Sequence, residues 1–365
     1  MTAVPSATAR AAESASLPVP ATLEWHDDTL YLLDQTRLPL EIVVERQASV
    51  EQVWASIRAL KVRGAPAIGV AGAYGLCVAM QASLTAPVDA FRARLAAQAA
   101  YLASARPTAV NLQWALRRLQ ARVVRHEAAH ACEAAALYDA LVDEARRIHA
   151  EDQALCEGIG RHGVALIRPG CGVLTHCNAG ALATTGIGTA TAPMYLAHRR
   201  GTRFRVYADE TRPLLQGARL TAFELQRAGL DVTLLTDSMA AATMQRGLVD
   251  LVLVGTDRVA ANGDVANKIG TLGVAILARH FGIPLYVACP SSTLDLATPT
   301  GEDIVIEERA SDEVTSVGAR RTAPEGVAVR NPAFDVTPHA LVAGFITERG
   351  LVGPPFGDTL ASLFR

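Results

Sequence analysis

The most reactive side chain at a favourable position in the sequence is the thiol of Cys177. It lies near the end of an apolar run, GVLTHCN at 172–178, and a Gly- and Thr-rich segment follows it. A helix is expected after this segment, and a helix N-terminus beside a partly exposed thiol favours the thiolate. The competing interpretation is a buried structural thiol, because free cysteines are among the most buried residues. We assign that interpretation to the other five cysteines, none of which forms a CxxC pair.

A carboxyl group stands in an equivalent position at Asp257. This residue ends the apolar run DLVLVGTD at 250–257. A carboxyl group surrounded by apolar side chains can stay protonated and can then act as an acid. The competing interpretation is a helix N-cap or turn carboxylate, which would require no chemistry.

Three cations accompany the thiol and the carboxyl group. Arg63 lies in VRGAPAIG, Arg106 in ARPTAVN and Lys268 in NGDVANKIGT. We expect Asn267 and Lys268 to begin a helix, where backbone N–H groups and a lysine together favour phosphate. Arginine suits the same task because its guanidinium forms paired hydrogen bonds with anions. These residues predict a small phosphorylated ligand, one thiol, one carboxyl group and no metal cluster.

A metal centre is suggested by the segment HEAAH at 126–130. This segment matches the HExxH zinc pattern, in which two histidines share one face of a helix. No third histidine follows at a spacing typical of metalloproteases, although Glu144 and Glu151 could be considered as ligands. We therefore interpret HEAAH as the solvated end of a helix.

Gly186, Gly188 and Asp209 suggest a different class of protein, a nicotinamide-dependent oxidoreductase. The glycines follow one apolar run and Asp209 ends the next, about twenty residues later, as in dinucleotide-binding βαβ units. However, a third glycine is missing, and Gly186 follows Asn178 by eight positions where a tight turn is required. We interpret the glycines as points where the backbone approaches a ligand or a neighbouring helix.

These groups need a scaffold, and the second half of the sequence predicts one. Five short apolar runs lie at 172–178, 203–210, 231–237, 250–257 and 283–290. Segments of helical periodicity separate them, which indicates an α/β fold with βαβ units and a mainly parallel sheet. Each run ends in polar groups, and in open α/β sheets ligands bind at the carboxyl ends of the strands. We expect the chemistry at that edge.

The first half of the sequence has a different pattern. Residues 22–48 alternate apolar and polar around a Pro-containing turn, which predicts a small β-hairpin. From Val50 to about Gly163, apolar residues recur at three- and four-residue spacing, which predicts amphipathic helices. Near the C-terminus, Thr337 and Pro338 are expected to cap and begin a helix. The predicted domains are a disordered tail at 1–22, a mostly helical domain at 23–160 and a Rossmann-like catalytic domain at 161–365.

Composition restricts the partners of the protein. The 365 residues include 34 Lys and Arg against 36 Asp and Glu, a formal net charge of −2. A near-neutral chain argues against general binding of nucleic acid or anionic membranes. The longest apolar stretch, 67–80, is interrupted by glycines and is shorter than the ~18–20 residues of a spanning helix. The N-terminal run lacks the apolar region of a secretory signal, so we expect a cytoplasmic protein with reduced thiols.

Seven segments together resemble a known family. They are RGAPAIG (63–69), RPTAVNLQWAL (106–116), THCNAGALAT (175–184), ETRPLLQGARLTAFEL (210–225), DSMAA (237–241), GTDRVAANGDVANKIGT (255–271) and NPAFDVTP (331–338). They are similar to the methylthioribose-1-phosphate isomerases, which belong to the wider initiation factor 2B alpha/beta/delta-like family. The resemblance extends from about residue 24 to residue 358.

The resemblance implies a fold, an activity and a set of site residues. The fold is a helical N-terminal domain and a C-terminal Rossmann-like domain, assembled as a homodimer. The activity is aldose–ketose isomerisation of a sugar 1-phosphate in methionine salvage, with no cofactor and no metal. Cys177 and Asp257 would be the catalytic pair. The implied substrate-binding residues are Arg63, Gly64, Ala65, Arg106, Gln216, Asn267 and Lys268.

The implied chemistry matches the groups found from the residues. Phosphate on C1 masks the aldehyde, so an acid must protonate the ring oxygen before a hydrogen moves from C2 to C1. We assign Asp257 as the acid and Cys177 as the group that moves the proton at carbon. A phosphoenolate route and a hydride-shift route both stay open. The substrate could also be 5-deoxyribose 1-phosphate or ribose 1,5-bisphosphate, and the chain could instead be a non-catalytic regulator like the initiation factor 2B subunits.

Overall fold

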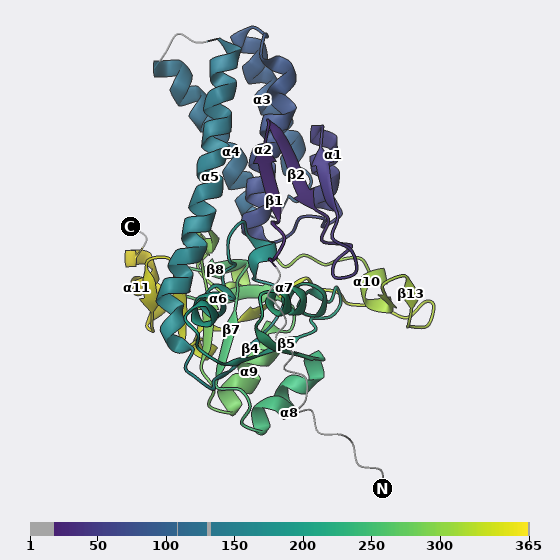
Figure 1. Ribbon diagram of the computed structural model, residues 1–365, viewed down its shortest axis with the longest axis vertical. Helices are drawn as coiled ribbons and strands as arrows, with labels where there is room; N and C mark the ends of the chain where they lie inside the picture. The colour runs from purple at the N-terminus through teal and green to yellow at the C-terminus, as the bar shows by residue number, and fades with distance from the viewer. Residues whose placement is uncertain (1–17, 108, 130–132, 364–365) are drawn as a thin grey trace.

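The computed structural model describes residues 18–107, 109–129 and 133–363 of the chain. A tall group of helices stands on an α/β part that contains the main sheet (Figure 1). Most of the tail predicted at 1–22 lies outside the described residues, but its last five positions belong to the folded structure. Thr22 is buried there and donates a hydrogen bond to the carbonyl oxygen of Ala181 at 3.0 Å.

Within the residues that the structure describes, the helical part contains five helices and a small sheet. The helices are α1 (Val50–Arg58), α2 (Ala65–Met80), α3 (Val88–Ala103), α4 (Val110–Ala129) and α5 (Ala134–Gly163). The small sheet contains β1 (Leu23–His26), β2 (Thr29–Leu33) and β3 (Val44–Gln47), all antiparallel. The segment predicted as a hairpin thus forms three strands. The predicted boundary at residue 160 falls within α5, which continues to Gly163.

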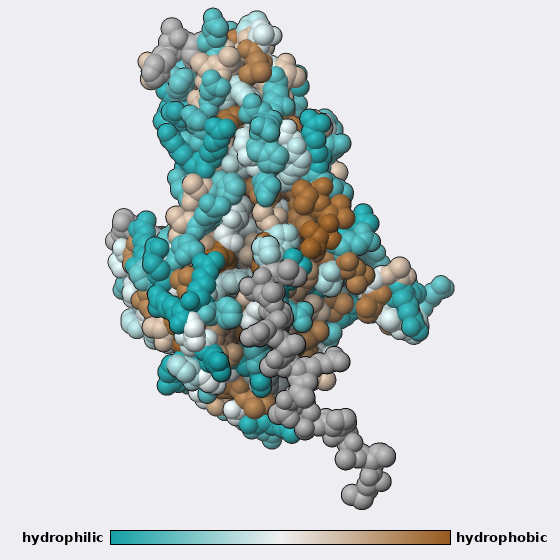
Figure 2. Space-filling model, viewed as in Figure 1, coloured by the Kyte–Doolittle hydropathy of each residue, from teal (hydrophilic) through white to brown (hydrophobic). Residues whose placement is uncertain are grey.

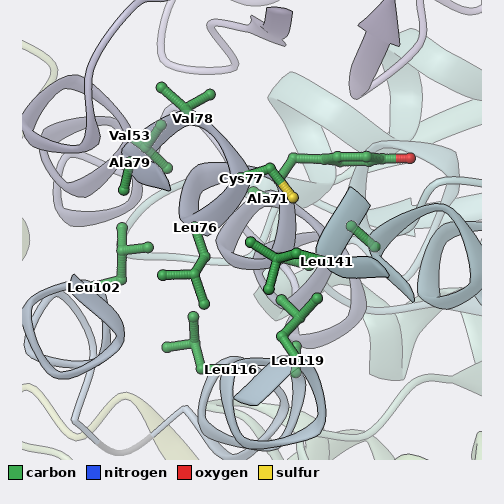
Figure 3. Close-up of a cluster of buried hydrophobic side chains, with 14 of the residues drawn as sticks. Val53, Ala71, Leu76, Cys77, Val78, Ala79, Leu102, Leu116, Leu119 and Leu141 are labelled. Atoms are coloured by element: carbon green, nitrogen blue, oxygen red, sulfur yellow. The ribbon is translucent and has the colours of Figure 1, made fainter. Parts of the chain in front are cut away.

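Helix α2 is the centre of this helical part. Leu76 and Cys77 of α2 point among leucines from α3, α4 and α5 (Figure 3). Small residues let the neighbours approach: a Cβ on Gly72 would lie 2.3 Å from Cδ1 of Leu112 in α4. The helical stretch Ala65–Ser83 has the length and mean hydropathy, 1.4, of a membrane span, but 78% of that window is buried. Its apolar surface is therefore explained by packing within the protein.

The main sheet confirms the predicted α/β architecture. Its strands are β4 (Gly172–Thr175), β5 (Arg205–Asp209), β6 (Asp231–Leu235), β7 (Leu251–Val254), β10 (Leu285–Ala288), β15 (Gly344–Thr347) and β16 (Gly350–Val352). They lie in the order β16-β15-β10-β7-β4-β5-β6, and every pairing is parallel except that of β15 with β16. All five predicted strands are present.

The strand order locates the place where a ligand should bind. From β4 the chain builds β5 and β6 on one side, and then returns to build β7, β10 and β15 on the other. The order therefore reverses between β4 and β7. In open α/β sheets such a reversal leaves a crevice at the carboxyl ends of the two central strands. Cys177 follows β4 and Asp257 follows β7.

Shorter elements complete the α/β part. Its helices are α6 (Ala192–Arg199), α7 (Ala222–Arg227), α8 (Ala240–Gln245), α9 (Thr271–His280), α10 (Asp312–Thr315) and α11 (Phe356–Leu363). A second sheet contains β11 (Leu294–Asp295), β8 (Arg258–Ala260), β9 (Val265–Lys268) and β14 (Phe334–Thr337), and β12 (Ser316–Val317) pairs with β13 (Arg320–Arg321). Single turns lie at Gln81–Ser83, Val164–Leu166, Ala181–Ala183, Gly217–Thr221, Asp237–Met239, Ser291–Thr293, Gly301–Asp303 and His339–Leu341.

The second sheet corrects two predictions. Asn267 and Lys268 end strand β9 and do not begin a helix, because α9 starts only at Thr271. Thr337 ends β14, and only a 3-10 turn follows Pro338 instead of the predicted α-helix. The reason is the same in both cases: β9 and β14 pair with each other in an antiparallel register. Each strand satisfies the backbone groups of the other, which local helix signals do not reveal.

The surface of the protein is mostly polar over the helical part, with an apolar patch beside the small sheet (Figure 2). Exposed apolar side chains lie in the segment that leads into β3, with Leu40 91%, Ile42 46% and Val44 54% exposed.

Candidate active site

A cavity of about 290 Å³ lies at the reversal of the main sheet. It is enclosed between the carboxyl edge of the sheet and the N-terminal ends of α2 and α4. All nine residues of the predicted site line it: Arg63, Gly64, Ala65, Arg106, Cys177, Gln216, Asp257, Asn267 and Lys268. The helical part supplies the first four and the α/β part the other five. The fold therefore brings together residues that lie up to about 200 positions apart.

The backbone of Cys177 is held in an unusual conformation. Its φ is 65°, in the left-handed region that non-glycine residues seldom adopt. Its N–H donates to Oγ1 of Thr211 at 2.8 Å, and its carbonyl oxygen accepts from Oγ1 of Thr221 at 2.6 Å. Two threonines from the connection between β5 and α7 thus clamp the residue on both sides.

The protonation state of the thiol differs from the expectation. Burial raises the pKa of Cys177, and the positive charges of Arg63 and Lys268 oppose this effect only in part. The helix N-terminus expected to favour a thiolate is absent at this position. A single 3-10 turn, Ala181–Ala183, comes next, and α6 begins only at Ala192. Cys177 is therefore a protonated thiol at neutral pH in the unliganded protein.

The other cysteines that the structure describes fit the interpretation as structural thiols. Cys77, Cys156, Cys171 and Cys289 are all buried and unbridged. Burial raises the pKa of Cys289 to about 12, so its thiol stays protonated and unreactive at neutral pH. Cys132 lies outside the described residues.

The carboxyl group of Asp257 has the environment predicted for an acid. Burial raises its pKa, although the cations Lys268, Arg63 and Arg106 oppose the shift. Strand β8 begins at the next residue, Arg258, so Asp257 is not a helix N-cap. Its backbone N–H donates to the carbonyl oxygen of Ala266 at 3.0 Å, which fixes it between the two sheets.

Lys268 is held rigidly at the cavity wall. Its ammonium group donates to the carbonyl oxygen of Ala333 at 2.8 Å and lies 4.6 Å from the ring centroid of Phe334. Burial lowers the pKa of Lys268, while Cys177 and Asp257 favour its charged form. The three titratable groups are therefore electrostatically coupled within one site.

Arg63 and the start of α2 form the opposite wall. The guanidinium of Arg63 donates to Oδ1 of Asn178 at 2.6 Å and to its carbonyl oxygen at 2.7 Å. Gly64 is the N-cap of the 16-residue helix α2, and Gly64, Ala65 and Pro66 all line the cavity. The helix N-terminus that favours an anion is thus found here and not at Asn267–Lys268.

We expect Gly64→Ala to lower the free energy of unfolding by about 2–3 kcal/mol, because φ at this residue is 88° and a Cβ would lie 2.4 Å from the carbonyl oxygen of Ala183. Urea unfolding followed by circular dichroism measures the loss. Gly201→Ala is the matched control, since its φ of 78° is similar but no described atom lies within 4 Å of the added Cβ. Equal losses in the two variants would contradict the close approach at Gly64.

Glu307 and Arg309 are charged cavity residues that were not predicted from the sequence. Glu307 lies 3.5 Å from Arg106 and 3.3 Å from Arg309, and both Glu307 and Arg309 line the cavity. They come from the irregular segment after the turn Gly301–Asp303, about 200 residues from Arg106, and no spacing pattern connects them. The charge of Glu307 also favours the protonated form of Asp257.

Gln216 offers a free hydrogen-bond acceptor to a ligand. Its side chain is buried, and its Oε1 has no hydrogen-bond partner among the residues that the structure describes. A buried polar atom left unpaired is costly unless something else satisfies it. Because Gln216 lines the cavity, a bound molecule can supply the missing donor.

The HEAAH segment has no place in this cavity. His126 and Glu127 lie near the far end of α4, about 25 Å from its first residue at the cavity. His130 lies outside the described residues. Glu144 and Glu151, considered as further ligands, both accept hydrogen bonds from the guanidinium of Arg118, at 2.6 and 2.7 Å. Both carboxylates are therefore engaged in an ion-pair network.

The dinucleotide pattern is explained by packing. Asp209 is fully buried, and one of its carboxylate oxygens lies 3.1 Å from Nδ1 of His176, so it is not available to a ribose. A Cβ on Gly186 would lie 3.0 Å from Cβ of Cys156 in α5. The interpretation of Gly186 as a point of close approach to a helix is thus confirmed.

His176, Asp209 and Asp237 are close enough to hold a metal ion. Each already has a partner: Nε2 of His176 lies 2.8 Å from the carbonyl oxygen of Ile269, and Asp237 accepts from the backbone N–H of Thr211 at 2.8 Å. This cluster is best understood as a hydrogen-bonded support beneath Cys177.

The fold and the cavity define a class: a Rossmann-like α/β protein whose helical part closes a cavity over the sheet, with Arg63, Arg106 and Lys268 in its lining. Residues 61–354 match the model of the Initiation factor 2 subunit family. The chain belongs to this family.

Relatives within the family cover nearly the whole chain. The chain is 55% identical over 347 residues to the methylthioribose-1-phosphate isomerase of Symbiobacterium thermophilum, covering 95% of this chain and 96% of that protein. It is 53% identical over 343 residues to a 5-deoxyribose 1-phosphate isomerase of Bacillus thuringiensis, covering 94% and 98%. Both matches agree with the resemblance noted in the sequence.

Two solved structures share the fold at more than 40% identity. The 5-methylthioribose 1-phosphate isomerase of Pyrococcus horikoshii superposes with a TM-score of 0.90 at 43% identity, covering 95% of this chain and 96% of that one. The initiation factor eIF-2B subunit delta of A. fulgidus gives 0.86 at 42% identity, covering 95% and 99%. The predicted fold class is confirmed.

Proposed function

We propose that the protein is an aldose–ketose isomerase that converts 5-methylthioribose 1-phosphate to 5-methylthioribulose 1-phosphate, a reaction of methionine salvage. One observation carries the proposal: a thiol, a raised-pKa carboxyl group and three cations line one cavity at the reversal of the sheet. Relatives named as isomerases of 1-phosphorylated sugars support it.

The cations would bind the phosphate group of the substrate. Arg63, Arg106 and Lys268 line the cavity together with the N-terminus of α2. A dianionic phosphate is favoured by such a combination of guanidinium groups, an ammonium group and free backbone N–H groups. We assign Gln216 and Asn267 to the hydroxyl groups of the sugar, since both side chains border the same space.

Asp257 would open the sugar ring. The proton of its carboxyl group passes to the ring oxygen, the bond between that oxygen and C1 breaks, and the oxygen of the phosphate ester stabilises the positive charge left on C1. Burial favours this role because it keeps the carboxyl group protonated at a pH where a solvated aspartate would be ionised.

The hydrogen then moves from C2 to C1 by one of two routes. In the first, the thiol of Cys177 loses its proton to solvent when the substrate is bound beside Arg63 and Lys268, whose charges favour the thiolate. The thiolate then removes the proton from C2, which leaves an enol phosphate, and returns that proton to C1. In the second, the hydrogen moves with its electron pair from C2 to C1, and the thiol of Cys177 stays neutral. In both routes the C2 hydroxyl proton passes to Asp257, which restores the acid. Neither route needs a cofactor.

The proposed setting is the cytoplasm and the proposed assembly is a homodimer. The exposed apolar side chains at Leu40, Ile42 and Val44 support the assembly, since exposed apolar patches often mark surfaces that a partner covers. The partner proposed for the cavity is a small sugar phosphate, with neither nucleic acid nor a membrane involved.

Turnover of three sugars tests the substrate. The protein is incubated separately with 5-methylthioribose 1-phosphate, 5-deoxyribose 1-phosphate and ribose 1,5-bisphosphate, and phosphorus NMR follows the products. We expect the highest kcat/KM for the methylthio sugar. Turnover of the deoxy sugar alone would assign the activity named for the relative of Bacillus thuringiensis. No turnover of any sugar would favour a non-catalytic regulator.

A further inference from the structure

Glu224 of α7 is a buried carboxylate directly behind the loop that carries Cys177. It is 0% exposed, and three donors from this loop surround it. The backbone N–H groups of Ala181 and Leu182 donate to it at 3.1 and 3.0 Å, and Nδ2 of Asn178 donates at 3.3 Å. Three donors in one place suit a carboxylate, whose two oxygens both accept hydrogen bonds. An amide of the same shape would set its own NH₂ group against one or two of these donors.

The loop is built closely around this carboxylate. A Cβ on Gly180 would lie 1.6 Å from Oε1 of Glu224, so only glycine leaves room for the side chain. Burial raises the pKa of Glu224 to about 7, while the hydrogen bonds from Leu182, Asn178 and Ala181 favour its charged form. The positive charge of Arg63 also favours the charged form.

The amide group of Asn178 connects Glu224 to the cavity. Because Nδ2 is turned toward Glu224 and toward Oγ1 of Thr221, Oδ1 is turned toward Arg63. Arg63 donates to that oxygen at 2.6 Å and to the main-chain oxygen of the same residue at 2.7 Å. The guanidinium therefore meets a side-chain acceptor only while the amide keeps this orientation.

We propose that Glu224 is a positioning residue: its carboxylate fixes the Asn178 amide and, through that amide, the Arg63 guanidinium at the cavity wall. The inference rests on the proposed role of Arg63 in binding the substrate phosphate. Glu224 itself lines no part of the cavity and touches no substrate. It acts by determining which way the Asn178 amide is turned, so that Nδ2 donates to Glu224 and Oδ1 accepts from Arg63.

Glu224→Gln tests whether the carboxylate determines the orientation of the Asn178 amide, because the substitution replaces an acceptor oxygen by a donor NH₂ group with almost no change of shape. The new NH₂ group must face either the N–H of Ala181 or the N–H donors of Leu182 and Asn178. When it faces Asn178, that amide turns and presents Nδ2 to Arg63, donor against donor. We expect KM for the sugar phosphate and Kd for inorganic phosphate to rise about tenfold, as for the loss of a hydrogen bond to a charged group. The value of kcat should change less than KM.

The Arg63→Ala background shows whether Glu224 acts through Arg63. Calorimetry gives Kd for inorganic phosphate in the wild type, E224Q, R63A and the double variant. If the effects share one pathway, E224Q should change Kd less than twofold once Arg63 is gone. A full tenfold effect in the R63A background would overturn the proposal, since Glu224 would then act elsewhere.

Glu144→Gln is the matched control for a general loss of stability. Glu144 is a buried glutamate that accepts from Arg118 at 2.6 Å in the helical part, and it does not line the cavity. We expect E144Q to lower the urea midpoint while leaving Kd for phosphate within twofold. If E224Q instead behaves like E144Q, with lower stability and unchanged Kd, the positioning role is wrong.

The outcomes separate this inference from the proposed function. Unchanged phosphate affinity in R63A would contradict the assignment of Arg63 to the phosphate. Weakened affinity in R63A with unchanged affinity in E224Q would overturn only the role of Glu224. Should E224Q fold poorly, Asn178→Ala carries the same test, because it removes the amide that joins the two residues. An unchanged Kd in N178A would also overturn the proposal.

Discussion

Replacing Asp257 by asparagine should lower kcat at least about 100-fold and leave KM within a few-fold of the wild type. The amide has nearly the same shape but cannot give a proton to the ring oxygen, and general acid catalysis contributes about 10²–10⁴-fold. Steady-state kinetics with the methylthio sugar measures both constants. The effect belongs to kcat because Asp257 would be needed when the ring opens and not when the phosphate binds.

Asp295→Asn is the matched control for this experiment. Asp295 lies on β11, which pairs with the strand that follows Asp257, and forms an ion pair with Arg258 at 3.3 Å without lining the cavity. Its variant should keep kcat within twofold. A D257N protein as active as D295N would remove Asp257 from the mechanism.

The role of Asp257 as an acid also predicts the direction in which kcat/KM changes with pH. The active form is the protonated carboxyl, so kcat/KM falls as the pH rises through the pKa of Asp257. Burial raises that pKa, which extends the active range upward from that of a solvated aspartate. The residual activity of D257N should lack this decline at higher pH.

Replacing Cys177 by serine should lower kcat by about 10²–10⁴-fold, the range expected for a group that moves a proton in the transition state. The hydroxyl of serine fits the position but is a far weaker acid than a thiol, so it cannot take and return a proton at carbon. Binding should be retained, because phosphate is assigned to the cations. Titration with inorganic phosphate then separates binding from turnover.

Cys289→Ser is the control for burying a hydroxyl group in place of a thiol. Cys289 follows β10, is 0% exposed and does not line the cavity. We expect its variant to lose stability while keeping kcat within twofold. If Cys177→Ala kept kcat within tenfold of the wild type, the hydride-shift route, with the thiol in a supporting role, would replace the proton shuttle.

Much of the fold could be predicted from the sequence because buried parallel strands leave a strong local pattern. The runs that became β4, β5, β6, β7 and β10 are short, rich in Val and Leu, and each ends in polar groups. That pattern also predicted the edge where the cavity lies. The order of the strands was not readable, since it depends on which strands pair across long connections.

The environment of the site residues was harder to predict than their identity. The segment with Lys268 resembles a helix start, yet pairing with β14 makes it a strand. A thiolate was expected at Cys177, but burial, which depends on the whole fold, raises its pKa. Glu307 and Glu224 were missed because their partners, Arg106 and Asn178, lie far away in the sequence. Local spacing carries no information about such contacts.

A crystal structure of the protein with its ketose product bound tests the central claim most directly. The account predicts that Sγ of Cys177 and the carboxyl group of Asp257 flank C1 and C2 of the sugar, with the phosphate against Arg63, Arg106 and Lys268. A product bound outside the cavity would contradict it. So would a sugar whose C1 and C2 face away from both Cys177 and Asp257.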